Sequence, residues 1–225
     1  MSRSVFAVKI IKKLFPRKFT KSKLMENRAI TRFIEKKLFE GDELFCLPRD
    51  KVISVGVELD APENMVLPSQ VVDHFIEKAG FRWIMNFCIC RDALSCKDYP
   101  PQLGCLFLGE AARGINPSLG RPVSRDEALD HVRRCRDAGL VHFVGRSKLD
   151  TVWLKIGPGE KLFTICSCCP CCCITRGVTI APPVIGDKIH RMPGVTVSVN
   201  DACKACGTCV AHCFAHESGG NIEHG

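Results

Sequence analysis

The stretch KLFTICSCCPCCC, residues 161–173, carries a strand pattern straight into six cysteines. Its first half is apolar and β-branched and follows a Gly-Pro-Gly turn at 157–159, which predicts a β-strand. The thiols that follow are Cys166, Cys168, Cys169, Cys171, Cys172 and Cys173. Six thiols exceed the four ligands of one tetrahedral ion, and adjacent ones such as Cys168 and Cys169 should point apart, toward different metals. We expect four of the six to be ligands, and the spacing does not say which.

A second block of cysteines lies upstream, in NFCICRDALSCKDYPPQLGC, residues 86–105. Its four candidate ligands are Cys88, Cys90, Cys96 and Cys105. Arg91 lies among them, and a cation there would offset the negative charge of a thiolate-ligated cluster and raise its reduction potential. Structural zinc is the alternative, but an iron–sulfur cluster is the better interpretation.

The third block, DACKACGTCVAHC at 201–213, has the most specific spacing. Its candidate ligands are Cys203, Cys206, Cys209 and Cys213. The pattern C-x2-C-x2-C-x3-C is typical of ferredoxins that bind a [4Fe–4S] cluster, whereas zinc sites usually use two separated C-x2-C pairs. Two features depart from the ferredoxin pattern: Phe214 stands where proline is usual, and no second run follows.

Composition favours metal ligation over disulfides. The chain has 225 residues, 16 of them cysteine, with 46% hydrophobic and 25% charged residues, an ordinary globular balance. Lysines interrupt the apolar N-terminal stretch, which therefore lacks the pattern of a secretory leader, and no run approaches the roughly 18 apolar residues of a membrane span. We expect a cytoplasmic protein whose thiols stay reduced and bind metal.

The net charge of +8 is concentrated in residues 1–25, which hold eight basic side chains and no acid. We interpret this segment as a basic amphipathic arm in which Pro16 ends any helix. It can contact an anionic membrane surface or an acidic partner, or remain a solvated flexible arm; the sequence leaves these open. Nucleic acid is an unlikely partner, because the rest of the chain is neutral and has one tyrosine and two tryptophans for base stacking.

The remaining pattern predicts an α+β fold. Its parts are the arm at 1–25, a helical N-terminal region at 26–80, a cysteine-rich cluster-binding domain with a short antiparallel sheet at 81–193, and a ferredoxin-like 4Fe–4S segment at 194–225. Within them we predict helices at 30–38, 68–79, 103–114 and 124–139, and strands at 51–59, 140–145, 151–157 and 161–166. Ser124 and Glu127 have capping-box spacing, and Cys135 falls on the apolar face of its helix, as a core residue rather than a ligand.

Several of these stretches resemble a known family. NFCICRDALSCKDYP, LGCLFLGEAARGINPSLGRPVS, EALDHVRRCRDAGLVH and TICSCCPCCC, followed by the ferredoxin run, are similar to archaeal and bacterial multi-cluster 4Fe–4S ferredoxin-like proteins. The resemblance covers about residues 60–214 and implies iron–sulfur binding and electron transfer. Relatives generally continue into a second ferredoxin motif, which is missing here.

The leading hypothesis is an electron carrier or redox subunit with about three [4Fe–4S] clusters and a redox partner protein. One alternative is a reductase with an unusual catalytic cluster in the CSCCPCCC block. The other is a zinc-stabilised binding module. No Walker loop, G-x-G-x-x-G or H-E-x-x-H motif is present, so a carrier is favoured over an enzyme.

Overall fold

A seven-stranded mixed sheet forms the centre of the computed structural model, which describes residues 2–19, 27–47, 67–174, 181–193 and 204–206. The strand order is β4-β2-β3-β6-β5-β1-β7. The strands are β1 (Glu43–Leu47), β2 (Arg82–Met85), β3 (Leu106–Leu108), β4 (Gly120–Pro122), β5 (Val141–Arg146), β6 (Phe163–Cys168) and β7 (Ile189–Arg191). Neighbours pair antiparallel except β1 and β7, which are parallel. The α+β class is confirmed, and β1 and β7 make the sheet wider than the short antiparallel one expected.

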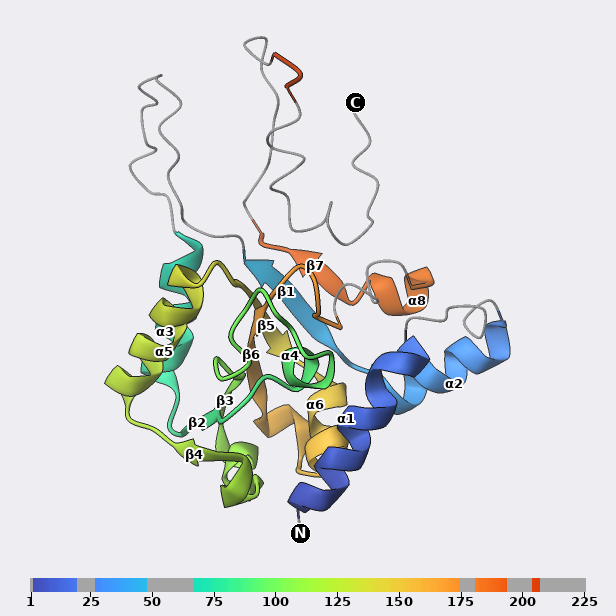
Figure 1. Cartoon of the computed structure of the whole chain (residues 1–225), viewed down its shortest axis with the longest axis horizontal. Helices are drawn as coiled ribbons and strands as arrows, with labels where there is room; N and C mark the ends of the chain where they lie inside the picture. Colours follow the sequence, from blue (N-terminus) through green and yellow to red (C-terminus); the bar gives the residue numbers. More distant parts are fainter. Residues whose placement is uncertain (1, 20–26, 48–66, 175–180, 194–203, 207–225) are drawn as a thin grey trace.

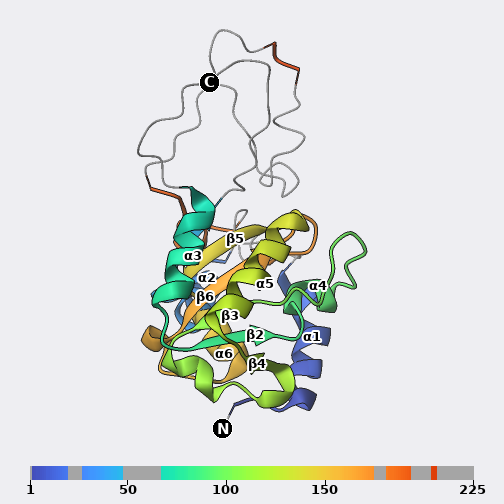
Figure 2. The same ribbon diagram turned by 90° about the vertical axis from the view of Figure 1, so that its left-hand side faces the viewer.

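Helices lie on both faces of this sheet (Figures 1 and 2). The α-helices are α1 (Val5–Phe19), α2 (Arg28–Leu38), α3 (Pro68–Lys78), α4 (Ile89–Ala93), α5 (Arg125–Asp137), α6 (Lys148–Leu154) and α8 (Pro183–Gly186). Short 3₁₀ helices are η2 (Glu110–Gly114), η3 (Pro117–Leu119) and η4 (Gly159–Lys161). Helices α3 and α5 pack together on one face, and α1, α4 and α6 cover the other.

Strand periodicity divides the buried residues between these two faces. In β3, Leu106 and Leu108 pack with α3 and α5, whereas Phe107 packs with α1, α4 and α6. In β6, Ile165 packs with the residues of α3 and α5, and Cys166 contacts those of α1, α4 and α6. Because side chains alternate along a strand, Cys166 and Cys168 share the face that carries α4.

The predicted helices α2, α3 and α5 and the strands β5 and β6 are confirmed. The capping box of α5 is formed as expected: the Glu127 N–H donates to Ser124 Oγ at 3.2 Å, and the Ser124 N–H donates to Glu127 Oε2 at 2.8 Å. Cys135 is fully buried and packs with Leu103 and Leu140, which confirms it as a core residue. The strand predicted at 51–59 and most of the ferredoxin-like segment lie outside the described residues.

Two element types were predicted wrongly. Residues 103–114 form β3 and then η2 rather than one helix, because Leu106–Leu108 is buried on both faces and such a strand has no alternating pattern. Residues 151–154, within the strand predicted at 151–157, instead form the end of α6. Ser147 caps this helix by accepting from the Asp150 N–H at 3.4 Å, and that local bond outweighs the strand propensity of its apolar residues.

Helix α1 corrects the interpretation of the N-terminal arm. It continues through Pro16 to Phe19, although the proline removes one helix hydrogen bond. Val8 is 1% exposed in the core, and the Arg3 N–H donates to the Leu154 carbonyl at 3.0 Å. This packing holds α1 on the body, so its described side chains do not form a free arm. Among the described helices, none has both the length and the apolar character to cross a bilayer.

Gly104, beside Cys105, is a position where a larger residue should destabilise the fold. A Cβ there would lie 2.3 Å from the Met85 carbonyl oxygen and 2.7 Å from that of Phe87. We expect Gly104→Ala to lower the free energy of unfolding by about 1–3 kcal/mol in chemical denaturation, because rigid backbone must move. Gly80→Ala is the matched control, since a Cβ at Gly80 meets nothing within 4 Å. Equal denaturation midpoints for the two variants would contradict the prediction.

Candidate metal centre

The first two cysteine blocks converge where β6 ends. Helix α4 and the loop after it carry the first block, and β6 and its following turn carry the second. Their cysteines are reduced thiols. These ten thiols fall into two groups. The four-thiol group consists of Cys96, Cys169, Cys171 and Cys172. The rest form a six-thiol ring, defined by Cys88, Cys90, Cys105, Cys166, Cys168 and Cys173. The thiol groups therefore do not coincide with the sequence blocks, because Cys96 of the first block lies with second-block thiols.

The four-thiol group has the geometry of a metal site. Its Sγ atoms all lie within 4.8 Å of one another, and those of Cys96 and Cys171 are 3.6 Å apart. A tetrahedral ion with metal–sulfur bonds of about 2.3 Å spaces its sulfurs about 3.8 Å apart, so this group can hold a metal ion. Burial raises the pKa of Cys169, and that of Cys172 to about 12. A bound metal would displace those protons.

The six-thiol ring is closed by contacts between successive thiols. Their order is Cys88, Cys105, Cys166, Cys168, Cys173, Cys90 and back to Cys88. The Sγ atoms of Cys105 and Cys166 are 3.5 Å apart, and those of Cys168 and Cys173 are 2.9 Å apart. None of the six is exposed.

Crowding in the ring separates the acidities of its thiols. Hydrogen bonds from Cys105 and Cys90 lower the pKa of Cys88. The same crowding, led by the contacts of Cys173 with Cys90 and of Cys166 with Cys105, raises the pKa of Cys90 and Cys105. The thiolate form is thus favoured at Cys88, while Cys90 and Cys105 stay protonated, because adjacent negative charges in a buried site repel.

Arg91 of α4 lies between the two thiol groups and is 0% exposed. Its Nε donates to the Pro100 carbonyl at 3.1 Å, its Nη1 to the Ser167 carbonyl at 2.7 Å, and its Nη2 to the Leu103 carbonyl. These bonds tie the first block to the second. No ion pair between described residues includes Arg91.

The charge of Arg91 is instead balanced by sulfur. Burial alone would lower its pKa, but the negative charge of Cys88, whose own pKa is lowered, and of Cys105 and Cys169 once they lose their protons, outweighs that effect and raises it. Cys88 and Cys105 belong to the ring and Cys169 to the four-thiol group, so the guanidinium acts on both. A buried cation is costly without a compensating negative charge, so this arrangement favours anionic, metal-bound thiolates.

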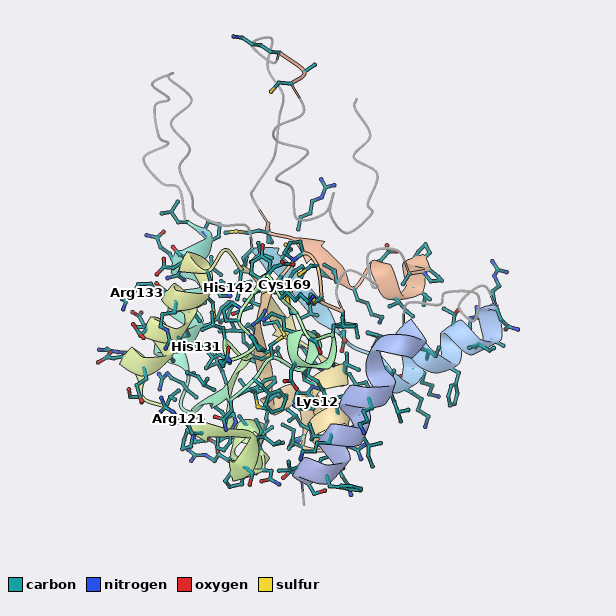
Figure 3. All side chains as sticks on the ribbon, in the orientation of Figure 1. Lys12, Arg121, His131, Arg133, His142 and Cys169 are labelled. Atoms are coloured by element: carbon teal, nitrogen blue, oxygen red, sulfur yellow. The ribbon has the colours of Figure 1, made fainter. Side chains whose placement is uncertain are left out.

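Helix α1 braces the element that carries Arg91. Lys12, labelled in Figure 3, pairs with Asp92 of α4 and lies over the Phe87 ring, 3.5 Å from its centroid. Figure 3 also labels Cys169, in the turn after β6. The position of α4 beside this turn therefore depends partly on the N-terminal helix, whose role the sequence did not indicate.

A cavity of about 60 Å³ adjoins the six-thiol ring and is lined by all six of its cysteines. Most other lining side chains are apolar, but Asp42 and Asp150 also reach it. Asp150 accepts from Trp153 Nε1 at 2.8 Å and from Thr164 Oγ1 at 2.9 Å, and burial raises its pKa. Sequence reasoning missed both aspartates, because each resembles an ordinary turn or helix-start residue.

Asp42 predicts a pH dependence of stability. Burial raises the pKa of Asp42 from 3.8 to about 6, so the folded state binds this proton more tightly than the unfolded state does. The resulting contribution to the free energy of unfolding is fully present below pH 3.8 and is lost as pH rises through 6. Between pH 5 and 7 the wild type should lose about 1 kcal/mol more unfolding free energy than Asp42→Asn. Urea titrations at both pH values measure this, with the exposed Asp126→Asn as control. Parallel profiles for wild type and Asp42→Asn would contradict it.

The ferredoxin run is only marginally within the described residues. Cys206 is exposed, whereas Cys203, Cys209 and Cys213 lie outside them. The structure therefore leaves this third site as a prediction. Cys46 in β1 and Cys135 in α5 are not members of either thiol group.

No family model, curated protein or solved structure matches this chain. Its function is therefore inferred from the cysteine spacing and from the geometry of the two thiol groups.

Proposed function

We propose that this chain is an iron–sulfur protein that transfers electrons as a carrier or redox subunit, with about three [4Fe–4S] clusters. The observation that carries the proposal is the convergence of two thiol groups around Arg91, a buried cation with no acidic partner among the described residues. Thiolates gathered in this way are soft ligands suited to iron–sulfur clusters or zinc. The ferredoxin spacing of Cys203–Cys213 and the family resemblance favour the clusters.

Electron transfer fits the arrangement because the two thiol groups are neighbours that share one cation. Centres held close together can exchange single electrons, and the protein needs only to position them and tune their potentials. Arg91 would raise the potential of both, since reduction adds negative charge beside it. The third cluster, in the ferredoxin segment, would connect them to a redox partner.

The proposed partner surface is the exposed side of α1. Phe6, Ile10 and Leu14 are spaced one helical turn apart and are exposed, and Lys9 and Lys13 are exposed beside them. An apolar stripe with basic neighbours suits an acidic partner protein. Binding to that partner should weaken with salt. Sedimentation with anionic vesicles at physiological salt would instead assign this surface to a membrane.

A zinc-stabilised module is the second candidate, because the sulfur spacing in the four-thiol group matches one tetrahedral ion. Anaerobic purification of the full chain, followed by iron, zinc and acid-labile sulfide analysis, separates the two. We expect about twelve irons per chain with matching sulfide, and interacting S = 1/2 signals in EPR after dithionite reduction. Stoichiometric zinc without sulfide would overturn the redox proposal.

A further inference from the structure

The six-thiol ring contains more thiols than a simple metal site uses. One tetrahedral ion takes four thiolates, and a [4Fe–4S] cube takes one for each iron. We propose that the ring holds a single polynuclear metal–thiolate centre that uses more than four of its six cysteines. The inference rests on the premise of the proposed function that these cysteines are metal ligands, and it replaces the [4Fe–4S] cube at the ring with a centre that has more cysteine ligands.

The closed contact order is the first support. Each ring thiol touches two others, so no subset of four is separated from the remaining two. The Sγ–Sγ distances, 3.5 Å for Cys105 and Cys166 and 2.9 Å for Cys168 and Cys173, place neighbouring ring thiols close enough to bind the same metal core.

The ring cannot give its two additional thiols to the neighbouring site. The four-thiol group already contains a full tetrahedral set, in which Cys169 packs with Cys135 of α5. Cys166, by contrast, contacts the residues on the α1, α4 and α6 face. Arg91 donates to the carbonyl of Ser167, between ring members Cys166 and Cys168, and so fixes the backbone that carries both.

Space is the third support. All six ring cysteines line the cavity of about 60 Å³, so a metal core can grow beyond a single ion without displacing the ring. The other walls are mostly apolar, and the two carboxylates that reach the cavity are already engaged. Asp150 accepts from Trp153 and Thr164. Asp42 accepts from the Lys148 N–H. Sulfur is thus the main donor available, which selects thiophilic ions: iron with inorganic sulfide, or zinc.

An alanine scan of the ring in the full chain, purified anaerobically, tests the ligand number. Each variant is read for total bound metal and, on ⁵⁷Fe-labelled protein, by Mössbauer spectroscopy. We expect at least five of the six ring variants to lower the metal content or change the spectrum of the ring's centre. Cys135→Ala is the matched control, because it also removes a buried thiol but belongs to neither group. Cys171→Ala should alter only the centre in the four-thiol group.

Two or more silent ring variants would overturn the inference, since four ligands would then suffice. Circular dichroism and retention of the other centre identify any variant that fails to fold, and for such a position Cys→Ser replaces Cys→Ala. The scan also separates this inference from the proposed function. Zinc without sulfide in the wild type would refute the iron–sulfur proposal, yet total metal lost per variant would still count the ring's ligands.

Discussion

Arg91→Met should lower the free energy of unfolding by about 3–5 kcal/mol, the usual cost of removing one partner from a buried charge pair. It should also reduce the metal content of both thiol groups. The variant keeps much of the side-chain volume but loses the bonds to Pro100, Leu103 and Ser167, and it leaves the thiolates without their buried cation. Denaturant titration and metal analysis of anaerobic protein measure the two effects.

Two further variants show whether charge or hydrogen bonding is responsible. Arg91→Lys keeps the positive charge but cannot reproduce the planar fork of three bonds, so it should retain more metal than Arg91→Met while still losing stability. Arg121→Met is the matched surface control, because its pair with Glu127 is 58% exposed on the arginine side and should contribute less than about 1 kcal/mol. Wild-type metal content and stability in Arg91→Met would show that the thiol groups do not need this cation.

Local signals in the sequence were enough for part of the fold. The capping box at Ser124 and Glu127 places the start of α5, and the apolar period of that helix identifies Cys135 as core. These features involve residues within one or two helical turns. Residues 106–108 were misassigned because their type depends on burial by distant segments, which a local pattern does not encode. Residues 151–154 were misassigned because the prediction gave no weight to the helix cap at Ser147.

The candidate site shows the same limit more clearly. Spacing singled out the cysteines as candidate ligands, but spacing within a block cannot reveal that Cys96 meets Cys169 while Cys105 meets Cys166. That division depends on the alternation of β6 and on the path of the loop after α4. Arg91 was singled out by its charge alone. Its three carbonyl partners lie 9, 12 and 76 residues away along the chain, outside helix α4, so only the fold reveals them.

Metal removal should loosen one part of the fold far more than another. The segments 88–105 and 166–173 are the ones joined by the two thiol groups, and without metal their buried thiols must either reprotonate or repel one another. Helices α3 and α5 instead pack through apolar residues such as Val72, Ile76 and Val132. We therefore expect these helices to keep more of their stability without metal, although Cys135 of α5 packs with Cys169.

Hydrogen exchange after anaerobic chelation should therefore show the largest loss of protection in the two cysteine segments and a smaller loss in α3 and α5. Structural thiolate-bound zinc contributes about 10–16 kcal/mol of binding free energy, which is comparable to the stability of a typical domain, about 5–15 kcal/mol. If the cysteine segments need metal to fold and the α3–α5 layer does not, the loss of hydrogen-exchange protection should differ between them. If the metal binds to a fold that is already stable without it, protection should stay the same in every segment. Equal protection with and without metal would support that second case and would remove the thiol groups from any role in folding.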